Sequence, residues 1–310
     1  MNYGGICMYE YYECTTTNTD IDIVFPTYNH EKYVIQAIES ILSQNTKYLY
    51  RIIIGEDKST DHTREIIQQY YKEHSDKIAL VLWKTNVGAV KNIYQLEKIC
   101  NAKYIAFLEG DDYWTDPLKL EKQIRFLEQH DDFIGTAHNV RCVDEKGKLL
   151  HRDYGMYPIR EEHIYERKHA LNFQHVAQTA SLIFRNFWKN WNEEQYEFFH
   201  KCCANGDFKV SIYLGLAGKV YYFRDIMADH RRVFHGDSWT AKTKEKNMLA
   251  YSNAVYREVQ ECMEILFKRS YGFTKQNNAI QKEAFECLMI HFNWTNLMVF
   301  LRIIFRNIRN

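Results

Sequence analysis

Three acidic side chains within four residues are the part of this sequence best suited to chemistry. Glu109, Asp111 and Asp112 come directly after Tyr104–Leu108, an apolar run that predicts a buried strand. In an open α/β sheet, ligands bind beyond the carboxyl ends of the strands, which is where these carboxylates would lie. Their oxygens could hold a hard divalent cation, Mg²⁺ or Mn²⁺, together with substrate phosphates. The simpler interpretation is that they cap the next helix, but Asp116 already fits that role.

Strand patterns that alternate with helix patterns would position these acids. The apolar strand segments are 21–25, 50–54, 78–83 and 104–108, and polar turns follow them. After each of the first three, apolar residues recur at helical spacing. This alternation predicts an α/β fold with a mostly parallel, Rossmann-like central sheet flanked by helices. The polar turns then lie along one edge of that sheet.

The residues of these turns suit a nucleotide. An aromatic ring and backbone groups suit a base, an acid suits a base or ribose, and a metal suits a diphosphate. The sequence has no GxGxxG and no GxxxxGK[ST] motif, so it supports neither a Rossmann dinucleotide site nor a P-loop. The simpler interpretations are a half-buried aromatic for Tyr28 and a helix-entry cap for Asp57. The predicted nucleotide-binding residues are Pro26, Thr27, Tyr28, Asp57, Asn86, Gly88 and Asp111.

The composition indicates a globular protein without a strong net charge. Apolar residues make up 46% of the 310, and Lys plus Arg equal Asp plus Glu at 40 each. We therefore expect no nucleic-acid partner, whereas 23 Tyr and 18 Phe suit stacking on rings. The cysteines form no CxxC pair, and no run of about 18 apolar residues could cross a bilayer. These features predict a cytoplasmic enzyme with reduced cysteines.

Three motifs, taken in order, resemble family 2 glycosyltransferases with the GT-A fold. Ile21–Tyr33 (IDIVFPTYNHEKY) is similar to the opening strand and turn of that family. Gly55–Asp61 (GEDKSTD) resembles its Asp-Asp-Gly-Ser-x-Asp turn, with Glu and Lys in place of the first Asp and the Gly. Leu108–Trp114 (LEGDDYW) resembles its DXD-type metal motif, with Glu in place of the first Asp.

The resemblance also implies a domain organisation. A GT-A catalytic domain would span 20–240, with a nucleotide-binding half at 20–115 and an acceptor half at 116–240. Residues 1–19 are polar and lack periodicity, which predicts a flexible leader. The strand pattern ends before the last stretch of the chain, which predicts a C-terminal helical extension at 241–310.

In the first half, the resemblance implies that Pro26–Tyr28 and Asp57 line the pocket for the nucleotide base. Asp111 would contact the ribose or the metal, and Asp112 would be the main metal ligand. Glu109 keeps the charge of the family residue on a longer arm, which leaves the coordination open.

In the second half, the resemblance implies a general base and a loop that closes over the diphosphate. Asp207 matches the acid at the start of a family helix and would be the base, with an N-cap as the simpler interpretation. His230–Trp239 is similar to the family's Tyr-Arg-x-His-Gly loop. Its two arginines would neutralise phosphate, or are simply exposed charges, and its histidine would ligate the metal or bind a phosphate oxygen. These loop residues are Arg231, Arg232 and His235.

The end of the chain carries an apolar stripe at helical spacing within 294–305, next to Arg302, Arg306 and Arg309. A basic amphipathic helix could lie on the inner face of the cell membrane as a peripheral contact. Packing on the catalytic domain or on a second subunit of a homo-oligomer explains the same stripe.

Together these features predict a metal-dependent, inverting glycosyltransferase. It would move a sugar from a nucleotide-sugar donor, most simply a UDP-sugar, to a hydroxyl of a glycan or lipid-linked acceptor in surface polysaccharide or glycoconjugate biosynthesis. The inverting outcome follows from the resemblance alone. A sugar nucleotidyltransferase is one alternative, but it would carry a Gly-rich, Arg/Lys-bearing loop after the first strand. A nucleotide-sugar-binding or scaffold protein without turnover is the other, and the joint presence of Asp57, Asp111, Asp112 and Asp207 argues against it.

Overall fold

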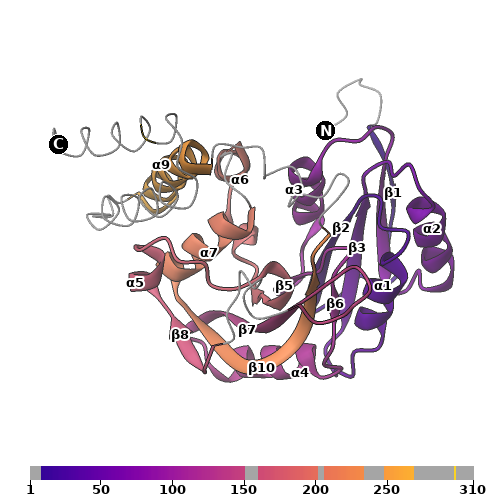
Figure 1. Cartoon of the computed structure of the whole chain (residues 1–310), viewed down its shortest axis with the longest axis horizontal. Helices are drawn as coiled ribbons and strands as arrows, with labels where there is room; N and C mark the ends of the chain where they lie inside the picture. The colour runs from indigo at the N-terminus through magenta and orange to yellow at the C-terminus, as the bar shows by residue number, and fades with distance from the viewer. Residues whose placement is uncertain (1–7, 151–159, 202–205, 234–247, 269–296, 298–310) are drawn as a thin grey trace. The chain divides into compact units, whose positions relative to one another are not determined.

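The structure is a computed structural model that describes most of the chain. Its described residues fall into two compact units, each of which is treated by itself (Figure 1). The described residues are 8–150, 160–201, 206–233, 248–268 and 297. The first unit takes its described residues from 1–164, 177–190 and 220–231, and the second from 165–176, 191–219 and 232–310.

A mixed β-sheet forms the centre of the first unit. In the described part of the chain the strand order is β1-β4-β3-β2-β5-β9-β7-β10-β6, and β8 pairs with β10. The strands are β1 (Tyr9–Tyr12), β2 (Ile21–Thr27), β3 (Tyr50–Glu56), β4 (Ile78–Trp83), β5 (Tyr104–Phe107), β6 (Tyr113–Trp114), β7 (Phe133–Val143), β8 (His163–Tyr165), β9 (Ile183–Arg185) and β10 (Lys219–Arg231).

The four central strands of this sheet are parallel. β2 pairs in parallel with β3 and β5, and β3 pairs in parallel with β4. Every residue of these four strands is buried, as expected for parallel strands that are covered on both faces. Ile23 lies opposite Ile52 on one side and Ala106 on the other. The predicted parallel sheet is thus confirmed at its centre, while antiparallel strands extend it.

Helices cover the sheet because each presents an apolar stripe. In α1 the buried residues Val34, Ala37, Ile38 and Ile41 repeat at helical spacing. α1 and α2 lie on one side of the sheet and α3 on the other (Figure 1). The helices of the first unit are α1 (Val34–Leu42), α2 (Thr63–Glu73), α3 (Ala89–Ile99) and α4 (Lys119–Gln129), with 3-10 turns η2 (Thr179–Ser181) and η3 (Phe187–Asn190).

The second unit is helical in its described part. Gly215 of α7 lies against α5, since a Cβ at that glycine would come within 2.6 Å of Tyr165 and 2.7 Å of Ala170. Its helices are α5 (Arg167–Ala170), α6 (Glu193–Lys201), α7 (Gly206–Ala217) and α9 (Met248–Phe267). α9 falls in the predicted helical extension, whereas the apolar stripe of 294–305 lies outside the described residues apart from residue 297. No described helix has the length and hydropathy needed to span a membrane.

Two features of the fold differ from the predicted organisation. Residues 9–12, expected within a flexible leader, form β1 antiparallel to β4, with the ring of Tyr9 packed 5.1 Å from that of Trp83. Backbone pairing and this ring contact hold the segment although its sequence lacks periodicity. In addition, β9 pairs with β5, so part of the predicted acceptor half completes the sheet of the nucleotide-binding half. The two predicted halves of the catalytic domain thus share one sheet.

Candidate functional site

The polar turns meet at the edge formed by the carboxyl ends of the parallel strands. The carbonyl of Thr27 accepts a hydrogen bond from Asp57 N at 3.1 Å. The carbonyl of Pro26 accepts one from Gly110 N at 3.1 Å. The turn after β2 is thus bonded to the turns after β3 and β5, as predicted for one shared edge. Tyr28 is half-buried in the same turn.

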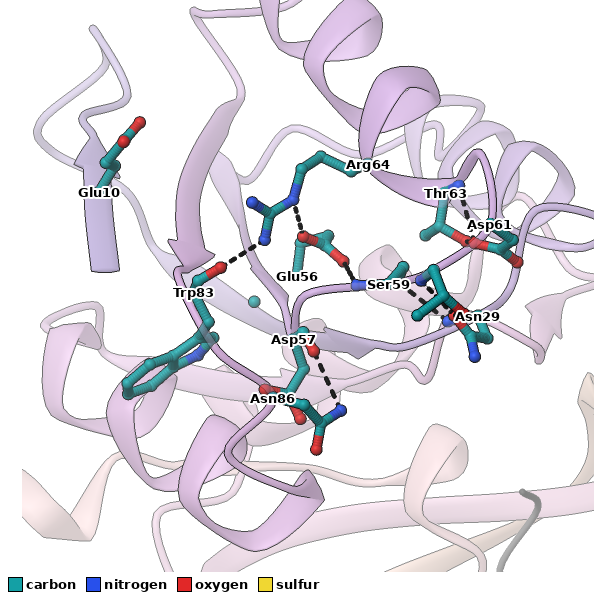
Figure 2. Close-up of polar contacts among 12 residues, drawn as sticks. Glu10, Asn29, Glu56, Asp57, Ser59, Asp61, Thr63, Arg64, Trp83 and Asn86 are labelled. Atoms are coloured by element: carbon teal, nitrogen blue, oxygen red, sulfur yellow. Dashed lines mark hydrogen bonds and ion pairs between the residues drawn. The ribbon is translucent and has the colours of Figure 1, made fainter. Parts of the chain in front are cut away.

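Asp57 holds the turn that precedes α3. Its Oδ1 accepts Val87 N at 2.7 Å and its Oδ2 accepts Gly88 N at 2.8 Å. Asn86 returns a hydrogen bond from Nδ2 to the Asp57 carbonyl at 3.1 Å (Figure 2). Burial raises the pKa of Asp57, although these two backbone N–H groups work against the rise. Asp57, Asn86 and Gly88 therefore form one connected group, in which the carboxylate holds the entry to α3 instead of capping α2.

The turns after β2 and β3 are joined by side chains as well. Asn29 accepts Thr60 N at 2.8 Å on its Oδ1, and its own N–H donates to Ser59 Oγ at 3.0 Å (Figure 2). Asn29 and Lys58 both adopt left-handed backbone conformations, with φ of 56° and 59°. A glycine takes this conformation without strain, which explains why the family motif has Gly where this chain has Lys58.

Glu56, which replaces the first acid of the same motif, faces the interior. It is fully buried, pairs with Arg64, and accepts Ser59 N at 2.6 Å. Arg64 also donates from Nη2 to the Trp83 carbonyl at 2.6 Å (Figure 2). The longer side chain thus ties the end of β3 to α2 and to the end of β4.

Asp111 lies on the acidic turn beside His30. His30 Nε2 is 3.9 Å from Asp111 Oδ2, and His30 Nδ1 is 3.1 Å from Thr27 Oγ1. The backbone of Gly110 packs so closely that a Cβ there would come within 2.5 Å of Thr27 Oγ1. Burial raises the pKa of Asp111; the neighbouring charge of Asp112 acts in the same direction, and His30 acts against it. The side chain of Asp111 has a relative solvent exposure of 22%.

Asp112, in contrast, is 1% exposed and is bonded to the protein through both oxygens. Gln178 Nε2 donates to Oδ2 at 2.9 Å, and Arg231 N donates to Oδ1 at 2.8 Å. His230 Nδ1 lies 3.0 Å from Oδ2 and 3.1 Å from Oδ1. Burial opposes a charge on His230, but Asp112 more than offsets it and raises the pKa of His230 to about 9. The two side chains therefore form an ion pair at neutral pH.

Arg231 is also directed into the protein. Its Nε donates to the Asp111 carbonyl at 2.9 Å, its Nη2 to Gln36 Oε1 at 2.7 Å and its Nη1 to the Glu145 carbonyl at 3.0 Å. The guanidinium lies 4.6 Å from the ring centre of Tyr33. As a diphosphate ligand Arg231 would have to give up these contacts, and its predicted phosphate role stays a prediction.

The acidic turn carries two partly exposed carboxylates, those of Glu109 and Asp111. In the described part of the chain, no three His, Cys, Asp or Glu side chains are grouped so that they could hold a metal ion. Asp112 would have to exchange protein donors for a metal, whereas Asp111 would not. Carboxylate oxygens such as those of Asp111 and Glu109 are ligands of the kind that suits Mg²⁺ or Mn²⁺, with water and phosphate oxygens completing the coordination. His235, predicted as a further ligand, lies outside the described residues.

Asp207 and Arg232 belong to the second unit. Asp207 stands in the first turn of α7, where its Oδ1 accepts Phe208 N at 2.8 Å, and it is half-buried. Its predicted role as general base stays a prediction, as does the phosphate role of Arg232, which is also half-buried.

Sequence reasoning missed three side chains that contact the acidic turn. They are His30, Gln178 and His230. His30 lies within Ile21–Tyr33 and His230 within His230–Trp239, but only neighbouring residues of these two motifs were given roles. Gln178 and His230 are 66 and 118 residues away from Asp112 along the chain, so spacing could not reveal the contacts.

An open α/β sheet with acidic and amide-bearing turns along its carboxyl edge is typical of nucleotide-binding proteins. The model of Glycosyl transferase family 2 matches residues 22–191 of this chain, and the chain belongs to that family.

Two relatives match a large part of this chain. An uncharacterized protein of Mycobacterium tuberculosis, Rv1520, is 30% identical over 228 residues, which is 73% of this chain and 62% of the relative. An uncharacterized glycosyltransferase of Methanocaldococcus jannaschii, MJ1057, is 29% identical over 198 residues, 62% of this chain and 67% of the relative. The chain thus spans about three-fifths of the mycobacterial protein.

The crystal structure of S. aureus TarS 1–349 in complex with UDP-GlcNAc matches with a TM-score of 0.64 at 13% identity. The match covers 92% of this chain and 79% of that one. This likeness concerns the fold, and it confirms the predicted α/β fold of the GT-A type.

Proposed function

We propose that this protein transfers a sugar from a nucleotide-sugar donor, a UDP-sugar, to a hydroxyl of a glycan or lipid-linked acceptor in surface polysaccharide or glycoconjugate biosynthesis. The observation that carries the proposal is the bonded group of turns at the carboxyl edge of β2, β3, β4 and β5. There, Thr27 is bonded to Asp57, Asp57 to Gly88, and Pro26 to the acidic turn. Membership of Glycosyl transferase family 2 supports the reaction class.

The choice of a UDP-sugar is supported by the complex of TarS, whose fold this chain shares, with UDP-GlcNAc. Pro26–Tyr28, Asp57 and the Asn86–Gly88 turn to which Asp57 is hydrogen-bonded would line the base pocket. Asp111 would face the ribose or the diphosphate, beside His30.

A divalent metal also belongs to the proposal. Asp111 would hold it, with Glu109 on the same turn and with His235 as a further candidate. When bound, Mg²⁺ or Mn²⁺ would neutralise charge that develops on the departing diphosphate. The chain's own part is to supply carboxylate oxygens at a turn whose backbone is fixed by the Gly110–Pro26 hydrogen bond.

Asp207 would remove the proton from the acceptor hydroxyl, whose oxygen attacks the anomeric carbon opposite the nucleotide and inverts its configuration. A carboxylate with an ordinary pKa near 4 is a weak base, so proton transfer would contribute about 10²–10⁴-fold and positioning much of the rest. Its place in the first turn of α7 fixes its backbone.

The proposal is tested by donor turnover. UDP-, GDP- and dTDP-sugars are incubated with the wild-type chain in Mn²⁺ or in EDTA, beside Asp111→Asn and Asp207→Asn. We expect one UDP-sugar to be consumed only with metal, Asp111→Asn to lose donor binding, and Asp207→Asn to bind donor but not transfer. Donor binding without turnover, with every acceptor extract offered, would favour a nucleotide-sugar-binding protein instead.

A further inference from the structure

The carboxylate of Asp112 is enclosed by three protein donors. Gln178, His230 and the backbone of Arg231 all lie within 3.1 Å of one or both of its oxygens. Two carboxylate oxygens offer about four acceptor sites, so these contacts use most of them. Asp112 is also almost fully buried, so its side chain faces the protein interior.

Gln178 is itself held in a fixed orientation. Its Oε1 accepts Ala180 N at 2.6 Å, which turns its amide NH₂ toward Asp112. The η2 segment behind it is anchored in the core, because Trp114 Nε1 donates to the Ala180 carbonyl at 3.1 Å and Gln123 Nε2 to the Ser181 carbonyl at 2.9 Å. Gln178 thus acts as a rigid donor.

The contacts between the acidic turn and the end of β10 are reciprocal. The side chain of Asp112 accepts from the backbone of Arg231, and the side chain of Arg231 donates to the backbone of Asp111 at 2.9 Å. The ring of His230 adds a third contact, from its Nδ1 to the carboxylate of Asp112. Asp111 and Asp112 of the turn are therefore bonded to His230 and Arg231, which are adjacent residues of β10.

We propose that Asp112 is a positioning residue whose carboxylate, held by Gln178, His230 and Arg231, anchors the acidic turn so that the neighbouring Asp111 faces the nucleotide diphosphate. The inference rests on the proposed function, since the donor site is what the anchor serves. It assigns different tasks to adjacent carboxylates: Asp111 toward the ligand and Asp112 toward the protein.

The test compares Asp112→Asn, Gln178→Glu, their double variant and Asp111→Asn as the matched control. Gln178→Glu keeps an acceptor for Ala180 N but turns a second carboxylate toward Asp112. In the double variant the donor and the acceptor exchange places, because the amide at position 112 can donate to the carboxylate at position 178. Thermal unfolding is measured without ligand, and Mn²⁺-dependent UDP affinity is measured by calorimetry well below the unfolding temperature.

We expect each of the two anchor variants to lower Tm by roughly 5 °C or more, as for a broken buried charge contact. Their UDP affinity should fall about tenfold and stay metal-dependent, and the double variant should regain most of both losses. Asp111→Asn should shift Tm by less than about 2 °C and lose metal-dependent UDP binding altogether.

The inference is overturned if Asp112→Asn behaves like Asp111→Asn, with an unchanged Tm, lost binding and no recovery in the double variant. Asp112 would then be a ligand in its own right. If the wild-type chain binds no UDP, the proposed function is wrong. The anchoring role of Asp112 is then judged from Tm alone: recovery of Tm in the double variant supports that role, and absence of recovery refutes it.

Discussion

Replacing Asp57 by Asn tests whether this carboxylate acts on the protein or directly on the nucleotide. In the structure each oxygen accepts one backbone N–H, from Val87 at 2.7 Å and from Gly88 at 2.8 Å. An Asn side chain keeps one acceptor but turns an NH₂ toward the other N–H. One charge-assisted hydrogen bond is lost and a buried donor is left unpaired, which costs about 2–3 kcal/mol of the free energy of unfolding.

At this cost Tm should fall by roughly 4–8 °C, read from thermal unfolding of the ligand-free chain. UDP affinity, measured by calorimetry, should fall as well, because the Asn86–Gly88 turn loses one of the two hydrogen bonds that fix it to Asp57. Asn86→Ala is the control: it removes the Nδ2 bond to the Asp57 carbonyl, leaves both hydrogen bonds of the Asp57 carboxylate in place and adds no charge. An Asp57→Asn variant that keeps the wild-type Tm and loses only UDP affinity would refute the reasoning and make Asp57 a direct nucleotide ligand.

Three further predictions follow from contacts within the first unit. Lys58→Gly should raise the free energy of unfolding by about 0.5 kcal/mol, since relief of a left-handed backbone exceeds the entropy cost of glycine; chemical denaturation that shows no gain over Lys58→Ala would contradict this. Arg51→Met should lower the free energy of unfolding by about 3 kcal/mol, because the fully buried Asp22 loses a bidentate partner at 3.0 Å. A loss below about 1 kcal/mol would count against a structural role of this ion pair. Burial opposes the charge of Asp61, but the hydroxyl and N–H of Thr63 hold the pKa of Asp61 below its ordinary value. The stability advantage of wild type over Asp61→Asn should therefore be complete above about pH 5 and shrink as pH falls through the folded-state pKa. An advantage that stays constant throughout the acidic range would be inconsistent with this reasoning.

The centre of the fold could be predicted because buried parallel strands leave a plain trace in the sequence. β4 is a continuous apolar run, and β2 and β3 each contain an apolar stretch, Ile23–Phe25 and Ile52–Ile54. Polar turns follow all three strands at their carboxyl ends. β1 and β9 could not be predicted in the same way. They are four and three residues long, and their pairing with β4 and β5 depends on partners far along the chain.

The candidate site shows the same limit. The sequence identified which turns carry the acids, since clustered carboxylates after a strand are visible in one dimension. It did not reveal which way each acid points. Asp111 and Asp112 are adjacent, yet one keeps part of its exposure and the other is enclosed by Gln178 and His230. Such orientations depend on contacts between residues that are far apart in sequence.

The measurement that tests the central claim most directly is photo-crosslinking with 5-azido-UDP-sugar in Mn²⁺, followed by peptide mapping. The account predicts label on peptides from the turns after β2, β3 and β4, within 26–33, 57–63 and 84–88, and loss of that label when excess UDP is present. Label confined to other parts of the chain, or label that UDP does not displace, would contradict the claim that this sheet edge binds the nucleotide donor.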